Sequence, residues 1–415
     1  MIKSDKKPEP QDVEKFRHEF PMLGNADAPV YFDNAATTLK PECVIKAVED
    51  YYYHFCANIN RGLYESSLLA TKKYESARTA AAAFIGALPE EIVFTPNTTY
   101  AINMVAASLP VLVGDRCRKK ILIPFSEHHS NMIPWMNLER RGFYTEFIRV
   151  DQAGRIDLND FYDRLDRTTA IVASSIVSNV SGVINPVVVM AEAAGECGAL
   201  FLADAAQAAA HVDINVKKLG VDFLALSGHK IYAPPGSGIL YGKTGLLEKM
   251  EPIVWGGGTV SSVRQDGFEP AAVPKKLEPG TPDIPAFSGL EAALGFVSDI
   301  GFDYQQYEKS LLEYCVYEMA KIPGLKIPGF VEEGTSFFNE RSAIIPFTLK
   351  GWDCSELPVV LDKQAKIAIR SGFHCAQPFT CSLSPEGVHR VSFAPYNTKK
   401  EIDLFIGILA ELAEL

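Results

Sequence analysis

A single lysine stands in an unusual setting in the stretch SGHKIYAPPGSG, residues 227–238. Lys230 follows Ser227, Gly228 and His229, and a run of glycines and prolines comes after it. Glycine lets the backbone come close to a ligand because it has no Cβ atom. Three functions compete for this ammonium group: an exposed surface charge, a phosphate ligand, or an amine that forms a Schiff base.

Other polar side chains follow apolar stretches in the same way. Each has an alternative structural explanation, such as a helix N-cap, and two adjacent histidines make a poor metal pair because they point in different directions. Together, however, they stand at successive predicted strand ends, which is where α/β sheets bind ligands. These residues are Thr98 and Thr99, His128 and His129, Asn179, Asp204 and Gln207.

These side chains match what pyridoxal 5′-phosphate (PLP) requires of a protein. A lysine forms an imine with the aldehyde, a carboxylate pairs with the ring nitrogen, and hydroxyls bind the phosphate. A Schiff-base lysine must be partly deprotonated, and burial near positive charge lowers such a pKa to about 7–8. The candidates are Lys230 for the imine, Asp204 for the ring nitrogen, Asn179 and Gln207 for the phenolic oxygen, a histidine for ring stacking, and Thr98, Thr99, Ser227 and His229 for the phosphate.

The elements that would position these residues alternate from about residue 30 to residue 245. Several runs are almost entirely apolar, which is typical of strands buried on both faces of a mainly parallel sheet. The alternation favours a doubly wound α/β architecture. The predicted strands are 29–34, 90–97, 119–127, 144–151, 169–179, 199–207, 221–228 and 238–242, and the predicted helices are 41–55, 67–87, 98–109 and 185–198.

The rest of the chain predicts a second, smaller α+β domain. Residues 250–285 are rich in Gly and Pro and are expected to be irregular. Helices are predicted at 286–300, 303–321 and 398–412, and strands at 343–349 and 366–370. We therefore expect a large domain over 26–285, a small domain over 286–415, and an N-terminal segment, 1–25, that packs on the small domain.

Composition excludes several classes of protein. The 415 residues carry a formal net charge of −11, whereas a nucleic-acid binder would show a basic surplus. The eight cysteines are scattered and form no C-x-x-C pair, which indicates reduced thiols and no zinc site. The N-terminus has no apolar signal region, and no apolar run is long enough to span a bilayer. We expect a cytoplasmic protein that binds neither membrane nor metal.

Several stretches together resemble class-V aminotransferase-like, fold-type I PLP enzymes, and specifically the cysteine desulfurases of the SUF-type group, which includes selenocysteine lyases. They occur from residue 31 to about residue 398, so the resemblance covers nearly the whole chain. It implies a large domain with a mainly parallel, seven-stranded sheet. The matching stretches are YFDNAATT, NRG, FTPNTTYAIN, EHHSNMIPW, VSNVSGVINP, DAAQAAAHVDI, SGHKIYAPPGSGILYG, WGGG, EPGTPD, IRSGFHCAQP and HRVSFAPYNT.

The resemblance also implies roles for individual residues. Lys230 forms the Schiff base with PLP, His128 stacks on its ring, and Asp204 pairs with the ring nitrogen. Thr281 reaches the phosphate from a second subunit, which implies a homodimer. The remaining roles are Thr98, Thr99, Ser227 and His229 at the phosphate, Gln207 and Asn179 near the ring oxygen, and Arg370, assisted by Arg390, at the substrate carboxylate, with Asn179 and with Asn60 and Arg61 of NRG also at the substrate.

Cys375, in GFHCAQP, decides the chemistry that the resemblance implies. The alternative is a buried structural thiol, the commonest role of a cysteine. As a nucleophile it must be a thiolate, and His374 or a nearby cation would lower its pKa. The implied activity converts L-cysteine to L-alanine, leaves a persulfide on Cys375, and hands the sulfur to an acceptor protein for iron–sulfur cluster or other thio-cofactor assembly. A selenocysteine or other cysteine-derivative β-lyase is the alternative, followed by a PLP aminotransferase or epimerase.

Four residues depart from the usual pattern of the group. Asn60 and Tyr64 replace histidines around Arg61, Tyr100 replaces an acidic residue, and Phe373 replaces a histidine. All four are expected at the substrate entrance or at a partner-facing surface. They leave open the exact substrate and the sulfur acceptor, while the PLP-binding residues are all present.

Overall fold

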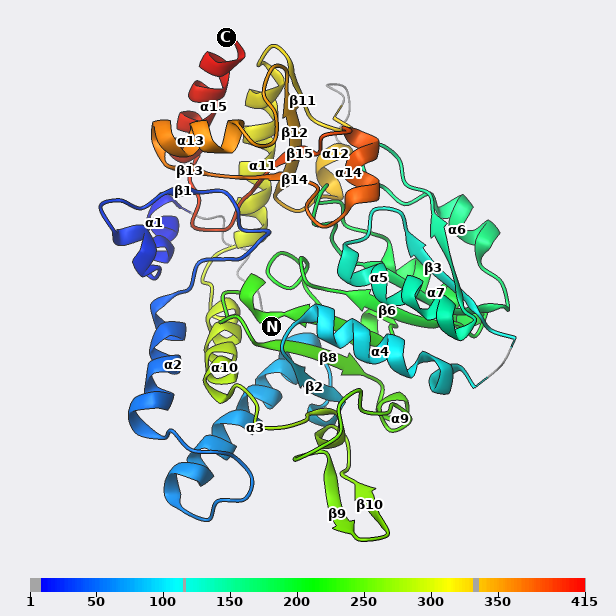
Figure 1. The fold of residues 1–415 in the computed structure, drawn as a ribbon. Coiled ribbons are helices and arrows are strands. Elements are labelled where there is room, and N and C mark those ends of the chain that lie inside the picture. The colour runs from blue at the N-terminus through cyan, green and yellow to red at the C-terminus, as the bar shows by residue number, and fades with distance from the viewer. Residues whose placement is uncertain (1–8, 115–116, 331–335, 415) are drawn as a thin grey trace.

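The computed structural model describes residues 9–114, 117–330 and 336–414 (Figure 1). Its largest element is a seven-stranded sheet in the order β2-β8-β7-β6-β5-β3-β4. Strands β3 to β7 run parallel, and β8 is antiparallel to both β7 and β2, so the predicted mainly parallel sheet is confirmed. The strands are β2 (Ile92–Thr95), β3 (Lys120–Pro124), β4 (Tyr144–Ile148), β5 (Thr169–Ser175), β6 (Leu200–Asp204), β7 (Phe223–Ser227) and β8 (Gly238–Gly242).

Helices cover both faces of this sheet, because successive side chains of a strand point to opposite faces. In β3, Leu122 packs into one apolar cluster, while Ile121 and Ile123 pack into another. The first cluster includes side chains of α2 (Glu42–His54), α3 (Glu65–Ile85), α7 (Val187–Glu196) and α10 (Ile284–Ser298), and the second those of α4 (Thr98–Val113) and α5 (Ile133–Met136). All strands except the edge strand β4 are therefore buried on both faces, as their apolar composition predicts.

A second, antiparallel sheet lies at the top of Figure 1 in the order β11-β12-β15-β14. Side chains of α11 (Tyr304–Ala320) and α15 (Lys399–Ala413) pack with it in a third apolar cluster. Its strands are β11 (Leu325–Lys326), β12 (Ile344–Leu349), β14 (Arg370–Gly372) and β15 (Val388–Ser392). The remaining helices are α1 (Pro10–His18), α6 (Leu158–Arg164), α8 (Val216–Leu219), α9 (Thr244–Leu247), α12 (Ser336–Asn339), α13 (Leu357–Ala365) and α14 (Gln377–Leu383).

The first predicted strand and the segment 250–285 differ from the prediction. The first predicted strand does not join the large sheet: β1 (Val30–Tyr31) pairs in parallel with β13 (Ile367–Ala368). Within 250–285, expected to be irregular, β9 (Val260–Arg264) and β10 (Gly267–Pro270) form an antiparallel hairpin that projects from the body (Figure 1). Its residues are almost all exposed, so no buried face imposed an alternating apolar pattern that sequence analysis could detect.

Residues on either side of the predicted domain boundaries pack against each other. Helix α10, placed in the small domain by sequence, packs against α2 and α3 of the large one. Arg17 of α1 pairs with Glu401 of α15 at 3.0 Å, and Phe16 stacks on Phe296 of α10. The division into 1–25, 26–285 and 286–415 stays a prediction. Within the described residues we find no helix with the length and apolarity needed to span a membrane.

Candidate active site

A cavity of about 390 Å³ lies where the carboxyl ends of the parallel strands meet residues of β14 and β15. This volume is in the range of small-molecule sites. The cavity brings together nearly all of the predicted site residues, although they come from segments hundreds of residues apart. Its lining includes Thr98, Thr99, His128, Asn179, Asp204, Gln207, Ser227, His229, Lys230, Arg370, His374, Cys375 and Arg390.

The first wall is the N-terminus of α4. The N-cap is Asn97, whose side chain accepts a 2.9 Å hydrogen bond from the N–H of Tyr100, so the alternative role of the threonines as N-caps is wrong. The N–H of Thr98 donates to Ser227 Oγ at 2.9 Å. The backbone of Asn97 packs closely against Gly238 of β8, where a Cβ atom would lie only 2.6 Å from the Asn97 Cα. Hydroxyls at a helix N-terminus are suited to a phosphate.

Lys230 ends a 3₁₀ turn, Gly228–Lys230, that directly follows β7. The carbonyl of His229 fastens this turn, since it accepts from Thr37 Oγ1 at 3.0 Å, Thr38 N at 3.1 Å and Lys40 Nζ at 3.0 Å. Burial lowers the pKa of Lys230 to about 8. The amine is therefore neither an exposed charge nor a permanent cation, which favours the Schiff-base role among the three alternatives.

Asp204 ends β6 and is buried. Its Oδ1 accepts from the N–H of Ala206 at 2.8 Å, and among the described residues no cation lies within salt-bridge distance of it. Burial raises the pKa of this carboxyl, whereas the Ala206 hydrogen bond and the charge of Lys230 lower it. A buried carboxylate in a ligand cavity is suited to a cationic ring nitrogen.

His128 lies between β3 and α5, where its Nδ1 accepts from the N–H of Ser130 at 3.0 Å. Burial and the charge of Lys230 lower its pKa to about 3, so the ring is neutral. A neutral ring in a cavity is suited to stacking on an aromatic ligand. Gln207 also lines the cavity, and its Nε2 donates to the Ala35 carbonyl at 2.6 Å.

Cys375 is exposed on a turn between β14 and α14. It and His374 have φ of 53° and 48°, in the left-handed region that non-glycine residues rarely adopt. Two hydrogen bonds hold this turn at the cavity: the N–H of His129 donates to the Cys375 carbonyl at 2.6 Å, and Asn179 Nδ2 donates to the His374 carbonyl at 2.7 Å. A strained backbone held in this way is typical of functional positions.

His374 does not supply the cation expected beside Cys375. Its Nε2 is 2.9 Å from the carbonyl of Val388, and burial lowers its pKa to about 3. The imidazole is therefore neutral. Three cations line the same cavity as Cys375, namely Lys230, Arg370 and Arg390.

Arg370 and Arg390 line the same cavity and share a carboxylate that sequence analysis missed. Asp33 accepts from Arg370 Nη2 at 2.9 Å and from Arg390 Nη2 at 3.2 Å. The stretch YFDN contains the only available signal, an acid directly after a short apolar run. A second missed acid is Glu127, which is fully buried and accepts from the N–H of Ser175 at 2.7 Å.

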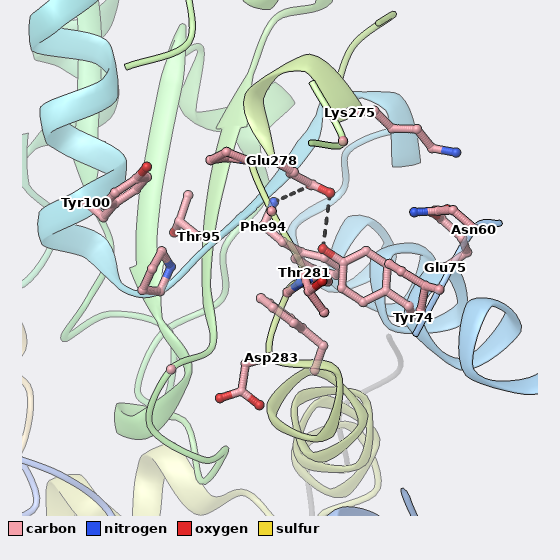
Figure 2. Close-up of a pocket in the computed structure, with 18 residues that line it drawn as sticks. Asn60, Tyr74, Glu75, Phe94, Thr95, Tyr100, Lys275, Glu278, Thr281 and Asp283 are labelled. Atoms are coloured by element: carbon pink, nitrogen blue, oxygen red, sulfur yellow. Dashed lines mark hydrogen bonds between the residues drawn. The ribbon is translucent and has the colours of Figure 1, made fainter. Parts of the chain in front are cut away.

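Thr281 and Asn60 are not brought to this cavity. They line a separate cavity of about 320 Å³ (Figure 2). There Glu278 accepts from Tyr74 Oη at 3.1 Å and from the N–H of Phe94 at 2.7 Å, just before the turn that carries Thr281. The contact predicted for Thr281 is with the phosphate of a second subunit, and it stays a prediction.

The other predicted substrate-entrance residues are also not among the residues that line the larger cavity. Arg61 is exposed, as are Tyr64 and Phe373, and Tyr100 lines the cavity that contains Thr281. Of the four departures from the family pattern, Asn60 and Tyr100 therefore share one cavity, whereas Tyr64 and Phe373 are not among its lining residues.

The donor set of the larger cavity matches PLP. It combines a partly neutral lysine amine, a buried carboxylate, a neutral imidazole and hydroxyls at a helix N-terminus. These are the groups that an aldehyde, a pyridine nitrogen, an aromatic ring and a phosphate require. The side-chain amide of Asn179 also donates a hydrogen bond to the backbone of the turn that carries Cys375.

Comparison with known proteins shows similarity over nearly the whole chain. Residues 30–405 match the family model described as Aminotransferase class-V. A probable cysteine desulfurase of Halalkalibacterium halodurans is 40% identical over 393 residues, which is 92% of this chain and 94% of the relative. A probable cysteine desulfurase of Pyrococcus abyssi is 37% identical over 410 residues, 98% of each chain.

Solved structures agree with these matches. The apo structure of a cysteine desulfurase from Thermococcus onnurineus NA1 superposes with a TM-score of 0.91 at 35% identity and covers 100% of both chains. The cysteine desulfurase CsdA from Escherichia coli superposes with a TM-score of 0.85 at 34% identity, covering 97% of this chain and 98% of the other.

Proposed function

Since the chain belongs to the class-V aminotransferase family and, within it, to the cysteine desulfurases, we propose that it converts L-cysteine to L-alanine and leaves a persulfide on Cys375. The predicted family and the fold class, a fold-type I PLP-dependent enzyme, are confirmed. Cysteine desulfurases depend on PLP, and we propose that this chain binds it covalently at Lys230.

The observation that carries the proposal is that Cys375 lines the same cavity as Lys230 and Arg370. An aminotransferase needs the lysine and the arginine, but has no use for a thiol at this position. Hydrogen bonds from two other loops hold the turn that carries Cys375, and these bonds keep Cys375 at the cavity.

The residues divide the work of the reaction. Arg370 binds the substrate carboxylate through its guanidinium group. When bound, PLP supplies an electron sink next to the substrate Cα. Lys230 Nζ accepts the α-proton, which a pKa near 8 allows at neutral pH. The Cys375 thiolate then attacks the substrate sulfur: a sulfur–sulfur bond forms, the Cβ–S bond breaks, and its electron pair stays on the carbon fragment. One proton is added at Cβ, and Lys230 returns the α-proton to Cα, which gives L-alanine.

The other proposed ligands of PLP follow from the walls of the cavity. Thr98, Thr99, Ser227 and His229 are proposed to bind the phosphate, and His128 to stack on the ring. Asp204 is proposed to hold the ring nitrogen, and Gln207 and Asn179 to lie near the ring oxygen. Their common cavity and their chemistry support these roles.

We also propose a homodimer. Thr281 lines a cavity apart from Lys230, on a turn anchored by Glu278. A second copy of the chain would supply the partner phosphate that Thr281 cannot meet within one chain. Asn60, which lines the same cavity, and Arg61 are proposed to act at the substrate entrance of that assembly.

A sulfur-acceptor protein and a role in iron–sulfur cluster or other thio-cofactor assembly complete the proposal. The exposure of Cys375 supports transfer of the persulfide sulfur to a second thiol. All eight cysteines are free thiols, which supports a reducing compartment such as the cytoplasm.

Substrate profiling of the purified holoenzyme tests the function. L-Cysteine should yield L-alanine and, with a reductant, sulfide in equal amounts, and Cys375→Ser should lose this activity. If Cys375→Ser and the wild type are equally poor with cysteine but both cleave selenocysteine rapidly, the β-lyase function replaces the desulfurase. Formation of a keto acid without sulfide would identify an aminotransferase.

A further inference from the structure

Two arginines of the active-site cavity face each other across a strand pair. Arg370 of β14 lies directly opposite Arg390 of β15 in the antiparallel register. Like charges in directly opposed positions of a sheet repel. The carboxylate of Asp33, which follows β1 on a third segment, lies against both guanidinium groups. This arrangement gives Asp33 two functions, one geometric and one electrostatic.

The geometric function concerns the edges of the Arg370 guanidinium. Asp33 Oδ1 and Oδ2 accept from Arg370 Nε at 3.1 and 3.0 Å, and Oδ2 also accepts from Nη2 at 2.9 Å. The edge formed by Nε and Nη2 is therefore occupied. Among the residues that the structure describes, none accepts a hydrogen bond from Arg370 Nη1. One bidentate edge, formed by Nη1 and Nη2, is left for a ligand carboxylate.

The electrostatic function concerns Arg390, which is only 2% exposed. Its Nη1 donates to the Asn179 carbonyl at 2.8 Å, and its Nη2 donates to Asp33 Oδ1 at 3.2 Å. A buried guanidinium needs a compensating charge, and Asp33 supplies it. Two arginines and one carboxylate thus leave one net positive charge at this end of the cavity.

We propose that Asp33 determines substrate specificity. Its carboxylate binds one edge of the Arg370 guanidinium and neutralises one of the two arginine charges. The site therefore accepts amino acids with a single carboxylate and disfavours dicarboxylic amino acids. The inference rests on the proposed function, because it takes Arg370 as the ligand of the substrate carboxylate. A second carboxylate on the substrate would find no free cation there and would be repelled by Asp33.

Isothermal titration calorimetry of the holoenzyme with L-alanine and L-aspartate tests this specificity. Neither amino acid contains sulfur, so the result does not depend on desulfuration, and a failure of sulfur transfer leaves the measurement intact. The wild type should bind L-alanine more tightly than L-aspartate. In Asp33→Asn, the ratio of the L-aspartate to the L-alanine dissociation constant should fall by about tenfold or more, because a charge-assisted hydrogen-bonding edge becomes free.

A charge-balanced variant separates specificity from structural damage. Asp33→Asn combined with Arg390→Met restores one net positive charge and removes the buried guanidinium, so its ratio should return to the wild-type value. If Asp33→Asn does not fold, Arg390→Met alone decides: it leaves no net charge, and L-alanine should bind about tenfold more weakly. An unchanged ratio in Asp33→Asn, or unchanged L-alanine binding in Arg390→Met, would overturn the proposal.

Discussion

The side-chain amide of Asn179 donates a 2.7 Å hydrogen bond to the backbone carbonyl of His374. Asn179 follows β5 of the large sheet, whereas His374 precedes Cys375 on the turn after β14, 195 residues further along the chain. The bond joins the two parts of the molecule at the position where the proposed nucleophile must meet the substrate. It also helps to hold His374 and Cys375 in their left-handed conformations.

Removing this tether should impair sulfur transfer without removing the cofactor. We expect Asn179→Ala to lower turnover of L-cysteine about tenfold, since a buried carbonyl loses its donor and the Cys375 turn loosens. The PLP content, measured by absorbance, should stay near that of the wild type. Asn137→Ala, on an exposed part of the surface, is the control. Equal activity of Asn179→Ala and this control would contradict the role of the tether.

Lys230 should be the point of covalent attachment of PLP. After borohydride treatment of the holoenzyme, mass spectrometry should find the pyridoxyl group on Lys230. Lys230→Ala should lower turnover at least about a hundredfold, because the general base is lost, yet still bind PLP through the other contacts. Lys243→Ala, in an exposed ion pair with Asp222, should behave as the wild type. A pyridoxyl group on a different lysine would contradict the assignment.

Attachment of PLP to the cofactor-free protein should accelerate with pH up to about 8, because burial lowers the pKa of Lys230 to that value. Only the neutral amine attacks an aldehyde, so the rate should rise while the ammonium loses its proton and level off above this pKa. Stopped-flow absorbance measures the rate. The charge of Asp204 raises the pKa of Lys230, so the midpoint should move to lower pH in Asp204→Asn. A wild-type midpoint near about 10.4, the value of an exposed lysine, would contradict this.

Glu278 should be a major contributor to the stability of the Thr281 turn. Its carboxylate forms a bidentate ion pair with the buried Arg78 at 2.7 and 2.9 Å. Glu278→Ala should therefore cost about 1–3 kcal/mol, because N–H donors of a buried guanidinium lose their acceptor and Arg78 keeps only Glu75 as an ion-pair partner. The exposed pair Arg264–Glu269 is the matched control, and Glu269→Ala should cost about 0–1 kcal/mol in the same urea titration. Equal costs would show that burial does not govern the Arg78 pair.

Sequence alone could predict the residues at the ends of the parallel strands. Asp204 and Ser227 directly end β6 and β7, and the architecture brings such positions to one edge of the sheet. No comparable rule relates Asp33 to its partners, since Arg370 and Arg390 lie 337 and 357 residues away in the chain. That contact depends on β1 pairing with β13, and a two-residue strand leaves no periodic pattern to detect.

Local environment explains the other differences. His374 was one of two alternatives for lowering the pKa of the Cys375 thiol, the other being a nearby cation. Burial keeps the His374 ring neutral, and the burial of one histidine cannot be derived from its neighbours in sequence. Thr281 was expected to act on a second subunit, and its place in the second cavity of its own chain is no departure from that expectation (Figure 2). Its proposed contact requires another copy of the chain, which sequence analysis inferred only from resemblance.

Cys375 and Cys381 provide a matched pair of cysteines, both exposed and six positions apart in the sequence. Cys375→Ser should keep the wild-type PLP content and its affinity for L-cysteine, but form no L-alanine, because serine offers no thiolate. It should retain part of its activity with selenocysteine, since selenium leaves more readily. Cys381→Ser should match the wild type in all four measurements. Normal desulfuration by Cys375→Ser together with loss in Cys381→Ser would assign the nucleophile to Cys381.

The most direct test of the account is a single turnover of the holoenzyme with L-cysteine in the absence of reductant, followed by mass spectrometry of the protein's peptides. We expect the peptide with Cys375 to gain one sulfur atom, in an amount equal to the L-alanine released, and the peptides with the other seven cysteines to stay unchanged. L-Alanine formed in that turnover with no added sulfur on Cys375, or with the sulfur on another cysteine, would contradict the central claim.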